Sequence, residues 1–198
     1  MFTSLSSFDH RPARADARRN AQRILDSAAE LLASDPLISL DRIAAHAQIS
    51  RTTLYHHFPG RDDLLNALTD RSVTEVCSAL QSARPTEGTA TEAMRRSLTS
   101  AWQVVGRYRG LLLINPRRLG RDELRRRLEP AVQPILALIT RGQRSQEFDS
   151  TLPPDWLLGL LIDMIHAANA QVSAGAMDTT TAEQALLRSA TAVLAARD

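Results

Sequence analysis

The chain has 198 residues, of which 43% are hydrophobic and 23% are charged, and its formal net charge is +2. This composition is typical of a globular protein with a sizeable core and one or two domains. The sequence has no apolar run of about 18 residues, which argues against a membrane span, and its polar N-terminus lacks the apolar core of a secretory signal. The single cysteine, Cys77, excludes an internal disulfide and predicts a cytoplasmic location, with Cys77 as a small helix residue.

Positive charge is unevenly distributed along the chain. All 24 basic residues are arginine. Five of them lie between His10 and Arg23 against one acid, Asp16, and the segment from Arg42 to Arg61 contains three arginines and no acid. The rest of the chain is nearly balanced. This local concentration, rather than the net charge, is the pattern expected of a protein that binds nucleic acid.

The N-terminal third predicts three helices after a disordered tail over residues 1–12. From about residue 13, apolar residues recur at the three- and four-residue spacing of an amphipathic helix. These residues are Ala21, Ile24, Leu25, Ala28, Leu31 and Leu32. Asp35-Pro36 ends the helix, because the residue before a proline disfavours the helical conformation.

A second helix is predicted after Ser39, which is a suitable N-cap, and Gln48 and Ile49 form the turn that follows it. Ala44 on this helix is small and allows another helix to cross closely. Ser50 is the N-cap of a third helix. A short helix held in this way by an apolar helix before it is the arrangement that places side chains in a DNA major groove.

The third helix has one apolar face. Leu54 and Phe58 are one turn apart and are predicted to face inward, and Pro59-Gly60 ends the helix. The side chains left for other surfaces are Arg51, Thr52, Thr53, Tyr55 and His56. For Tyr55 a place in the core remains an alternative.

The remainder of the chain is also predicted to be helical. A fourth helix over 61–83 has Asp62 and Asp63 in its first turn, where acids suit the helix dipole. Further helices are expected at about 89–107, 109–115, 121–142, 154–174 and 179–196. No segment shows the alternation of a strand. We therefore expect an all-α protein of about nine helices, with a three-helix N-terminal domain over 13–60 and a larger helical domain over 61–198, connected by helix 61–83.

The segment Ser50-Arg51-Thr52-Thr53-Leu54-Tyr55-His56-His57-Phe58, followed by Arg61-Asp62-Asp63-Leu64-Leu65, resembles the DNA-binding domain of the TetR/AcrR family of bacterial transcriptional regulators. Ile24-Leu25 and Ala28-Ala29 match the first helix of that family, and the resemblance covers about residues 14–68. It implies a helix-turn-helix domain at the N-terminus and an effector-binding and dimerisation domain after it.

The resemblance also implies which residues contact DNA. Arg51, Thr52 and Thr53 enter the major groove, where Arg51 would pair with guanine and Thr52 would touch a thymine methyl. Thr53, Tyr55 and His56 would hold phosphates, and Ser39 and Arg61 would fix the backbone. Arg14, with Arg18 or Arg19, would add phosphate contacts or a minor-groove arm. The full set is Arg14, Arg18, Ser39, Ser50, Arg51, Thr52, Thr53, Tyr55, His56 and Arg61.

The sequence departs from the family pattern in two places. Members usually have glycine at the position of Gln48, so that glutamine either adopts a positive φ, at a cost of roughly 1 kcal/mol, or avoids it. The loop over 34–38 is shorter than usual and lacks glycine. Both departures bear on the pitch of the third helix.

By resemblance, a small-molecule effector occupies the larger helical domain. The candidate lining residues are Met94, Trp102, Trp156, Asp163 and His166, together with Met164. Ordinary core packing is the alternative for most of them. Asp163 and His166 lie three residues apart on an apolar helix, where buried charge has to be paired. They either pair with each other, serve as a polar handle for a ligand, or contact a second subunit.

Two other polar clusters have simple interpretations. Adjacent His56 and His57 point about 100° apart on a helix and have no further ligand at a suitable spacing, so no metal and no cofactor is expected. A second run of arginines over 117–127 contains acid-to-base pairs four residues apart, Asp122 to Arg126 and Glu123 to Arg127, which predict a solvated, self-paired face.

The last two long helices are rich in small residues. By resemblance, they pair with the same helices of a second subunit in a four-helix bundle, although packing within one subunit remains an alternative.

The resemblance therefore implies a ligand-responsive repressor that binds a near-palindromic DNA operator as a homodimer. A dimeric interaction module without DNA recognition is one alternative. A small-molecule enzyme is the other, but the sequence shows no catalytic triad order, metal spacing or phosphate loop, so no enzymatic activity is expected. No membrane partner is expected either.

Overall fold

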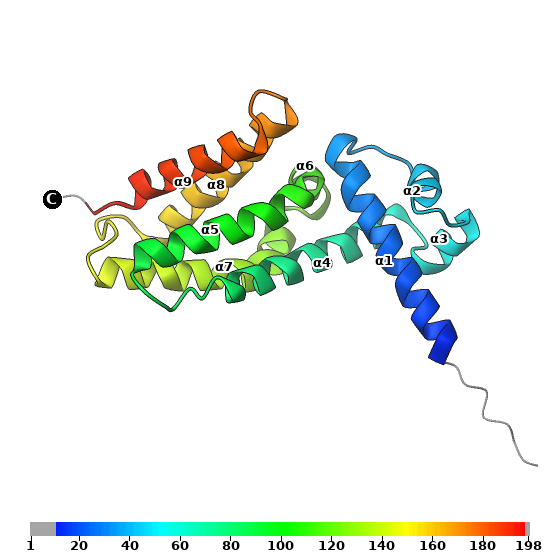
Figure 1. Ribbon diagram of the computed structural model, residues 1–198, viewed down its shortest axis with the longest axis horizontal. Coiled ribbons are helices and arrows are strands. Elements are labelled where there is room, and N and C mark those ends of the chain that lie inside the picture. Colours follow the sequence, from blue (N-terminus) through cyan, green and yellow to red (C-terminus); the bar gives the residue numbers. More distant parts are fainter. Residues whose placement is uncertain (1–10, 197–198) are drawn as a thin grey trace, which may run out of the picture.

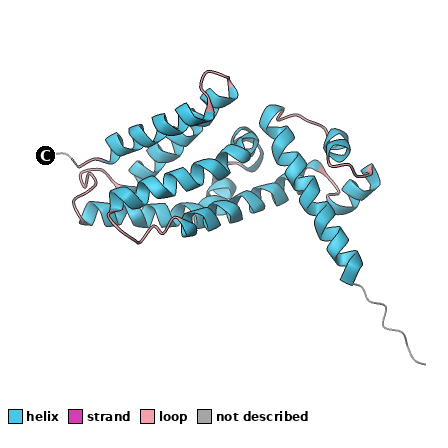
Figure 2. Ribbon diagram, in the orientation of Figure 1, coloured by secondary structure: helices cyan, strands magenta, loops and turns pink. Residues whose placement is uncertain are grey.

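The computed structural model describes the backbone of residues 11–196 and the side chains of residues 15–196. This part of the chain contains nine helices and no strand, which confirms the all-α prediction (Figure 2). The helices are α1 (Arg11–Ser34), α2 (Leu40–His46), α3 (Arg51–His57), α4 (Arg61–Ser82), α5 (Ala90–Arg107), α6 (Arg109–Leu119), α7 (Arg121–Arg144), α8 (Pro154–Ser173) and α9 (Thr179–Leu194). None of these helices is long and apolar enough to span a membrane.

The helices form two groups joined by α4 (Figure 1). We call α1–α3 the head and α5–α9 the body. The head lies at one end of the molecule, and α4 runs from it along α5 and α7. Helices α8 and α9 pack against each other on one side of the body. The short helices α2 and α3 therefore lie at the opposite end of the molecule from the end of α9 (Figure 1).

Two helix ends differ from the sequence prediction. Helix α1 begins at Arg11 rather than at residue 13, since Pro12 is tolerated in a first helical turn where its missing N–H is not needed. The tail prediction otherwise falls on residues 1–10, which lie outside the described residues. Helix α6 continues past the predicted end at residue 115, through Pro116, to Leu119. A proline inside a helix removes one hydrogen bond, and here that loss does not end the helix.

The core of the head is filled by side chains from all three of its helices. Ile24, Ile43 and Leu54 are completely buried. The same cluster includes Leu68 of α4 and Leu111 of α6. The head therefore packs its apolar faces against the first half of α4 and the start of α6, and it does not close its core alone.

The starts of α2 and α3 agree with the sequence prediction. The Ser39 hydroxyl accepts a hydrogen bond from the Arg42 N–H at 3.3 Å, and the Ser50 hydroxyl accepts one from the Thr53 N–H at 3.0 Å. These bonds satisfy N–H groups that have no partner within the first helical turn. Both hydroxyls therefore fix where the two helices begin.

The turn between α2 and α3 places Gln48 at φ 53°, so the glutamine does adopt the left-handed conformation. The Gln48 N–H donates to the Ala45 carbonyl and the Ile49 N–H donates to the Ala44 carbonyl, both at 3.1 Å. This pair of bonds is the Schellman motif, which usually has glycine at the left-handed position. The turn therefore keeps the hydrogen bonds that are usual for this motif, and Gln48 has the backbone strain of a residue with a side chain at a positive φ.

Head and body meet at a glycine. A Cβ atom on Gly110, near the start of α6, would lie 2.3 Å from the backbone oxygen of Leu32 in α1. Only a residue without a side chain permits this approach. Gly110 therefore sets the distance between the end of α1 and the body.

Candidate nucleic-acid interface and effector cavity

Helix α3 presents one face to the core and another to solvent. Leu54 is 0% exposed and Phe58 is 8% exposed, whereas Tyr55 is 42% exposed. Arg51, Thr52 and His56 are also exposed, and Thr53 is half-buried. The face that points away from the head is therefore made of one guanidinium, hydroxyl groups and an imidazole, all of which can donate hydrogen bonds to phosphate or base edges.

Arg51 pairs with an acid of the preceding helix. Its Nε atom lies 2.8 Å from Oδ1 of Asp41, and the two side chains are 69% and 44% exposed. An exposed ion pair of this kind stabilises by about 0–1 kcal/mol. The contact orients Arg51 at the start of α3 and is weak enough to be exchanged for a phosphate or a base.

The hydroxyl groups of Ser50 and Thr53 contact each other, with the oxygens 2.7 Å apart. Because the Ser50 hydroxyl also accepts from the Thr53 N–H, both side chains already contribute to the start of α3. The His56 and His57 rings lie edge to face, with centroids 5.8 Å apart. Among the described residues, no group of three metal-binding side chains is present.

The other residues that were predicted to contact DNA lie in different surroundings. Ser39 is exposed at the start of α2, and Arg18 is exposed on α1. The backbone of Arg14 belongs to α1, but its side chain lies outside the described residues. The Arg61 guanidinium donates to the Ile38 carbonyl and, at 2.7 Å, to the Pro36 carbonyl. Arg61 therefore anchors the short loop between α1 and α2.

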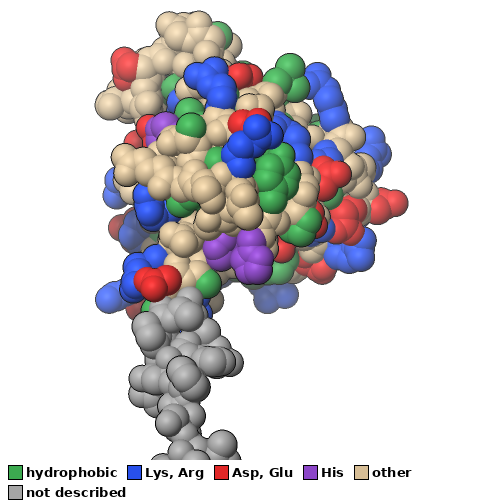
Figure 3. All heavy atoms as spheres, turned by 90° about the vertical axis from the view of Figure 1, so that its right-hand side faces the viewer, with side chains coloured by type: hydrophobic (Ala, Val, Ile, Leu, Met, Phe, Trp, Pro, Cys, Tyr) green, Lys and Arg blue, Asp and Glu red, His purple; other side chains and the backbone are tan. Residues whose placement is uncertain are grey.

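Figure 3 looks onto the end of the molecule that the head forms. Histidine side chains gather on this face, arginines are distributed around them, and Asp and Glu side chains gather along one edge. The face is therefore not uniformly basic. A surface of this kind predicts that position-specific contacts contribute alongside general attraction to phosphate.

The body contains a cavity of about 190 Å³ between α4, α5, α6, α7 and α8. Its walls are almost entirely aliphatic, and its polar members are Thr69, Ser72, Tyr108, Asn115 and His166. The aliphatic members include Val73, Val76, Val105, Leu112, Leu128, Val132 and Ile162. A cavity of this size and lining can hold a small organic molecule.

The five predicted ligand residues do not gather around this cavity. Only His166 lines it, while Met94 lines a second cavity of about 210 Å³ beside α9. Trp102 is 2% exposed and packs in a separate cluster between α5 and α9, whereas Trp156 is 58% exposed. Asp163 is exposed.

His166 differs electrostatically from an ordinary surface histidine. His166 is exposed, yet partial burial of its ring lowers the pKa of the imidazole, and the nearby Asp163 carboxylate opposes this shift. The lower pKa favours the neutral ring at physiological pH. The aliphatic lining residues were missed because their half-buried positions have the same residue types and spacing as ordinary core positions.

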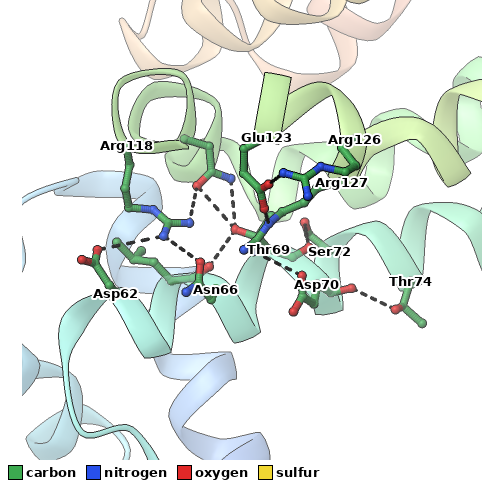
Figure 4. A network of polar contacts seen from close by, with 12 residues as sticks. Asp62, Asn66, Thr69, Asp70, Ser72, Thr74, Arg118, Glu123, Arg126 and Arg127 are labelled. Carbon is green, nitrogen blue, oxygen red and sulfur yellow. Dashed lines mark hydrogen bonds and ion pairs between the residues drawn. The ribbon is translucent and has the colours of Figure 1, made fainter. Parts of the chain in front are cut away.

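A polar network joins the cavity wall to the start of α4 (Figure 4). Asn115, which is buried, donates from Nδ2 to the Thr69 hydroxyl at 3.1 Å. Its Oδ1 accepts from Arg118 at 3.1 Å, and Arg118 also donates to Asn66 Oδ1 at 2.8 Å. Asp62 lies 4.0 Å from the same guanidinium. Arg118 therefore connects a cavity-lining residue of α6 to the first turns of α4, directly after the head.

The second run of arginines is paired, partly as predicted. Arg127 contacts Glu123 at 2.6 Å, which confirms that pair, and it also reaches Asp70 of α4 at 3.4 Å. Arg126 contacts Glu123, three residues before it, rather than Asp122, because Glu123 lies between both guanidinium groups. The run joins α7 to α4.

Comparisons with known proteins agree with this arrangement. Residues 24–68 match the family model described as "Bacterial regulatory proteins, tetR family". The chain is 31% identical to the HTH-type transcriptional repressor LfrR of Mycolicibacterium smegmatis over 139 residues, which are 70% of this chain and 71% of that protein.

Solved structures show the same fold. The TetR-like regulator LfrR from Mycobacterium smegmatis in complex with proflavine superposes with a TM-score of 0.74 at 28% identity, covering 92% of this chain and 98% of that one. A TetR family regulator from Marinobacter aquaeolei VT8 gives a TM-score of 0.70 at 16% identity, covering 94% of this chain and 100% of that one.

Proposed function

Because the chain belongs to the TetR family of bacterial transcriptional regulators, which are not enzymes, we propose that it is a dimeric, effector-responsive repressor acting in the cytoplasm on a near-palindromic operator. One observation supports this proposal above the others. Helix α3 exposes Arg51, Thr52 and Tyr55 while Leu54 and Phe58 fix it to the head. The polar face is therefore presented rigidly at one end of the molecule, as a helix that enters the major groove requires.

We assign different roles to the residues of the head, which we take as the DNA-binding domain. Arg51 recognises a base edge after leaving Asp41, and Thr52 lies beside it in the groove. Tyr55, His56 and Arg18 contact phosphates, which fixes orientation without specifying sequence. Ser39, Ser50 and Thr53 act at the helix starts, where their positions bring them near the DNA backbone. Arg61 acts by anchoring the loop before α2.

We assign dimerisation to the exposed faces of α8 and α9. On α8 this face combines Trp156 with the small residues Ala167 and Ala170, and on α9 it includes Ala185. Small side chains allow helices of two subunits to approach closely, and an exposed tryptophan gains free energy when a partner covers it. A two-fold axis through this surface presents two α3 helices to half-sites roughly 34 Å apart.

We assign effector binding to the cavity in the body. The similar regulator LfrR has been solved in complex with proflavine, so a protein with this fold accommodates a small molecule. A ligand that displaces Asn115 would alter the bond from Arg118 to Asn66 and so the position of the start of α4. A coupling of about 1–3 kcal/mol between the two sites is typical and suffices to release DNA.

Selection of duplexes from a random-sequence pool tests the proposal. The purified protein is expected to enrich one sequence with two inverted half-sites, since a two-fold dimer contacts equivalent bases twice. The Arg51→Ala variant is expected to enrich a less defined sequence, while an exposed arginine of the body, Arg125→Ala, serves as the matched control. Enrichment of no sequence by the wild-type protein would contradict DNA recognition, and enrichment of a single unpaired half-site would contradict the dimer.

A further inference from the structure

The cavity in the body has no charged wall. Its lining residues, all of them described by the structure, include no aspartate, glutamate or arginine. The cavity-lining Tyr108 contacts Glu75, whose carboxylate is already bound by Arg71 at 2.9 Å, Arg107 at 3.0 Å and the Tyr108 hydroxyl at 2.8 Å. A ligand in the cavity therefore meets no free carboxylate and no free guanidinium.

The hydroxyl groups of the lining are also occupied. Thr69 donates to the Leu65 carbonyl and Ser72 donates to the Thr69 carbonyl, both at 2.7 Å. Burial and the bond to Glu75 raise the pKa of Tyr108 to about 12, so this phenol stays neutral as well. Each of these three hydroxyl groups already donates its hydrogen within the protein, so it can only accept a hydrogen bond from a ligand.

His166 differs from these hydroxyl groups. Its ring belongs to the cavity lining although the residue is exposed to solvent, and partial burial lowers the pKa of the imidazole against the opposing effect of Asp163. A neutral imidazole offers one donor and one acceptor. His166 on α8 is therefore able to bind a hydroxyl or carbonyl group of a ligand without requiring charge.

The absence of counter-charges decides what the cavity can hold. Moving a charged group from water into an apolar site costs several kcal/mol unless an opposite charge or several hydrogen bonds meet it. A cation would find one aromatic ring, Tyr108, and no carboxylate, while an anion would find no positive group. A neutral apolar molecule has no charged group to remove from water, and it gains contacts with the aliphatic walls.

The cavity volume limits the size of the ligand. An apolar cavity of about 150 Å³ in another protein binds benzene. The volume here is about 190 Å³. We infer that the cavity selects neutral, mainly apolar molecules of one or two rings that carry a single hydroxyl or carbonyl group, with His166 binding that group. The regulatory meaning of this inference rests on the proposed function, but the ligand class itself does not depend on DNA.

Three naphthalene derivatives of equal size test the ligand class. They carry a hydroxymethyl, a carboxylate or an aminomethyl group and are neutral, anionic and cationic at neutral pH. Calorimetric titration of the DNA-free protein is expected to give a dissociation constant at least about tenfold lower for the alcohol than for either ion, because only the alcohol avoids burying a charge. Equal or tighter binding of either ion, or no binding by any of the three, would overturn the inference.

Variants locate the binding and test the role of His166. Val132→Phe places a ring in the cavity and is expected to abolish alcohol binding, while Leu113→Phe, on an exposed position of α6, is the matched control and is expected to bind normally. His166→Phe keeps the apolar wall and is expected to bind the alcohol and plain methylnaphthalene equally. Normal alcohol binding by Val132→Phe, or a retained preference for the alcohol in His166→Phe, would contradict the assignment.

A DNA experiment separates this inference from the proposed function. The alcohol is added to the protein bound to its selected duplex, and release is followed by anisotropy. Tight alcohol binding to the free protein without release of DNA would leave the ligand class intact and overturn the effector role. Release of DNA by the cationic derivative at lower concentration than by the alcohol would overturn the ligand class and leave the effector role intact.

Discussion

The head and the body of this protein are packed in opposite ways. In the head, Ile24, Ile43 and Leu54 are completely buried in one hydrophobic cluster. Between α4 and the body helices α5–α8 lies a cavity of about 190 Å³ that is lined by side chains of the same types. Side chains that line a void lack the van der Waals contacts that they would make in a close-packed core. The comparison suggests that rigidity serves the presentation of α3, while the body retains space for a ligand.

The largest expected difference comes from equivalent truncations in the two regions. Leu54→Ala removes a fully buried side chain from the head and is expected to lower the free energy of unfolding by about 3 kcal/mol or more. Leu128→Ala, at the half-buried wall of the cavity, is expected to cost less than half of that, because fewer atoms contact this side chain. Urea unfolding of both variants measures the difference. Equal losses would contradict the contrast in packing.

Two glycines near the contact between head and body allow a matched pair of substitutions. Gly110→Ala is expected to lower the free energy of unfolding by about 1–3 kcal/mol, because the added Cβ would lie against the backbone of Leu32. Gly106→Ala has no atom within 4 Å of the added Cβ and lies in α5, so it is expected to stabilise by about 0.5–1 kcal/mol. Thermal unfolding measures both, and a stabilising Gly110→Ala would show that the close approach is not required.

Two substitutions on α3 separate base recognition from phosphate contact. Arg51→Ala is expected to cost about 1–3 kcal/mol of discrimination at one operator position and to relax specificity there. Tyr55→Phe removes only a hydroxyl group and is expected to weaken binding to all sequences alike. Competition titrations with operators altered at single positions measure the two effects. Identical behaviour of the variants would show that this division of roles is wrong.

Replacing Gln48, which has a positive φ, is expected to give a modest gain in stability. Gln48→Gly is expected to raise the free energy of unfolding by about 1 kcal/mol, because glycine adopts a positive φ without the clash of a Cβ atom. Gln48→Ala keeps the Cβ atom and serves as the control without this gain. The measurement is chemical unfolding at neutral pH, and an equal gain in both variants would show that the side chain, rather than the backbone, is responsible.

The smallest effect concerns acid stability of the body. The Glu147 carboxylate accepts hydrogen bonds from the Thr91 and Ala90 N–H groups, both at 2.9 Å, which lower its pKa from 4.5 to about 2. A lowered folded-state pKa gives stability that is present above pH 4.5 and is lost as the pH falls towards 2. Glu147→Gln is expected to flatten the decline of the melting temperature across this range, with exposed Glu129→Gln as the control. An unchanged pH profile would contradict the account.

The two regions also differ in how far the sequence predicts them. The head was predictable because its pattern is local: Leu54 and Phe58 define one face, and Ser39 and Ser50 mark helix starts within a few residues. Nothing in the sequence decided the φ of Gln48, which depends on whether the turn keeps its Schellman bonds. That choice required the structure.

The cavity was not predictable because its walls come from five successive helices, and the lining residues are spread from Thr69 to His166. Val73, Val105, Val132 and Ile162 line it together, yet each has the spacing of an ordinary core residue. Rare residue types such as Trp102 and Trp156 stand out in the sequence instead, but the structure buries Trp102 in a separate hydrophobic cluster and leaves Trp156 at the surface. A void depends on the distances between helices, which residue spacing does not encode.

Fluorescence anisotropy of the protein on labelled duplex DNA from just upstream of its own coding region shows whether the face of α3 recognises a DNA sequence. We expect tight binding that unlabelled random DNA does not displace, with an affinity that falls steeply as salt rises because phosphate contacts release counterions. Binding that is equally strong on a scrambled duplex, with the same dependence on salt, would contradict this expectation.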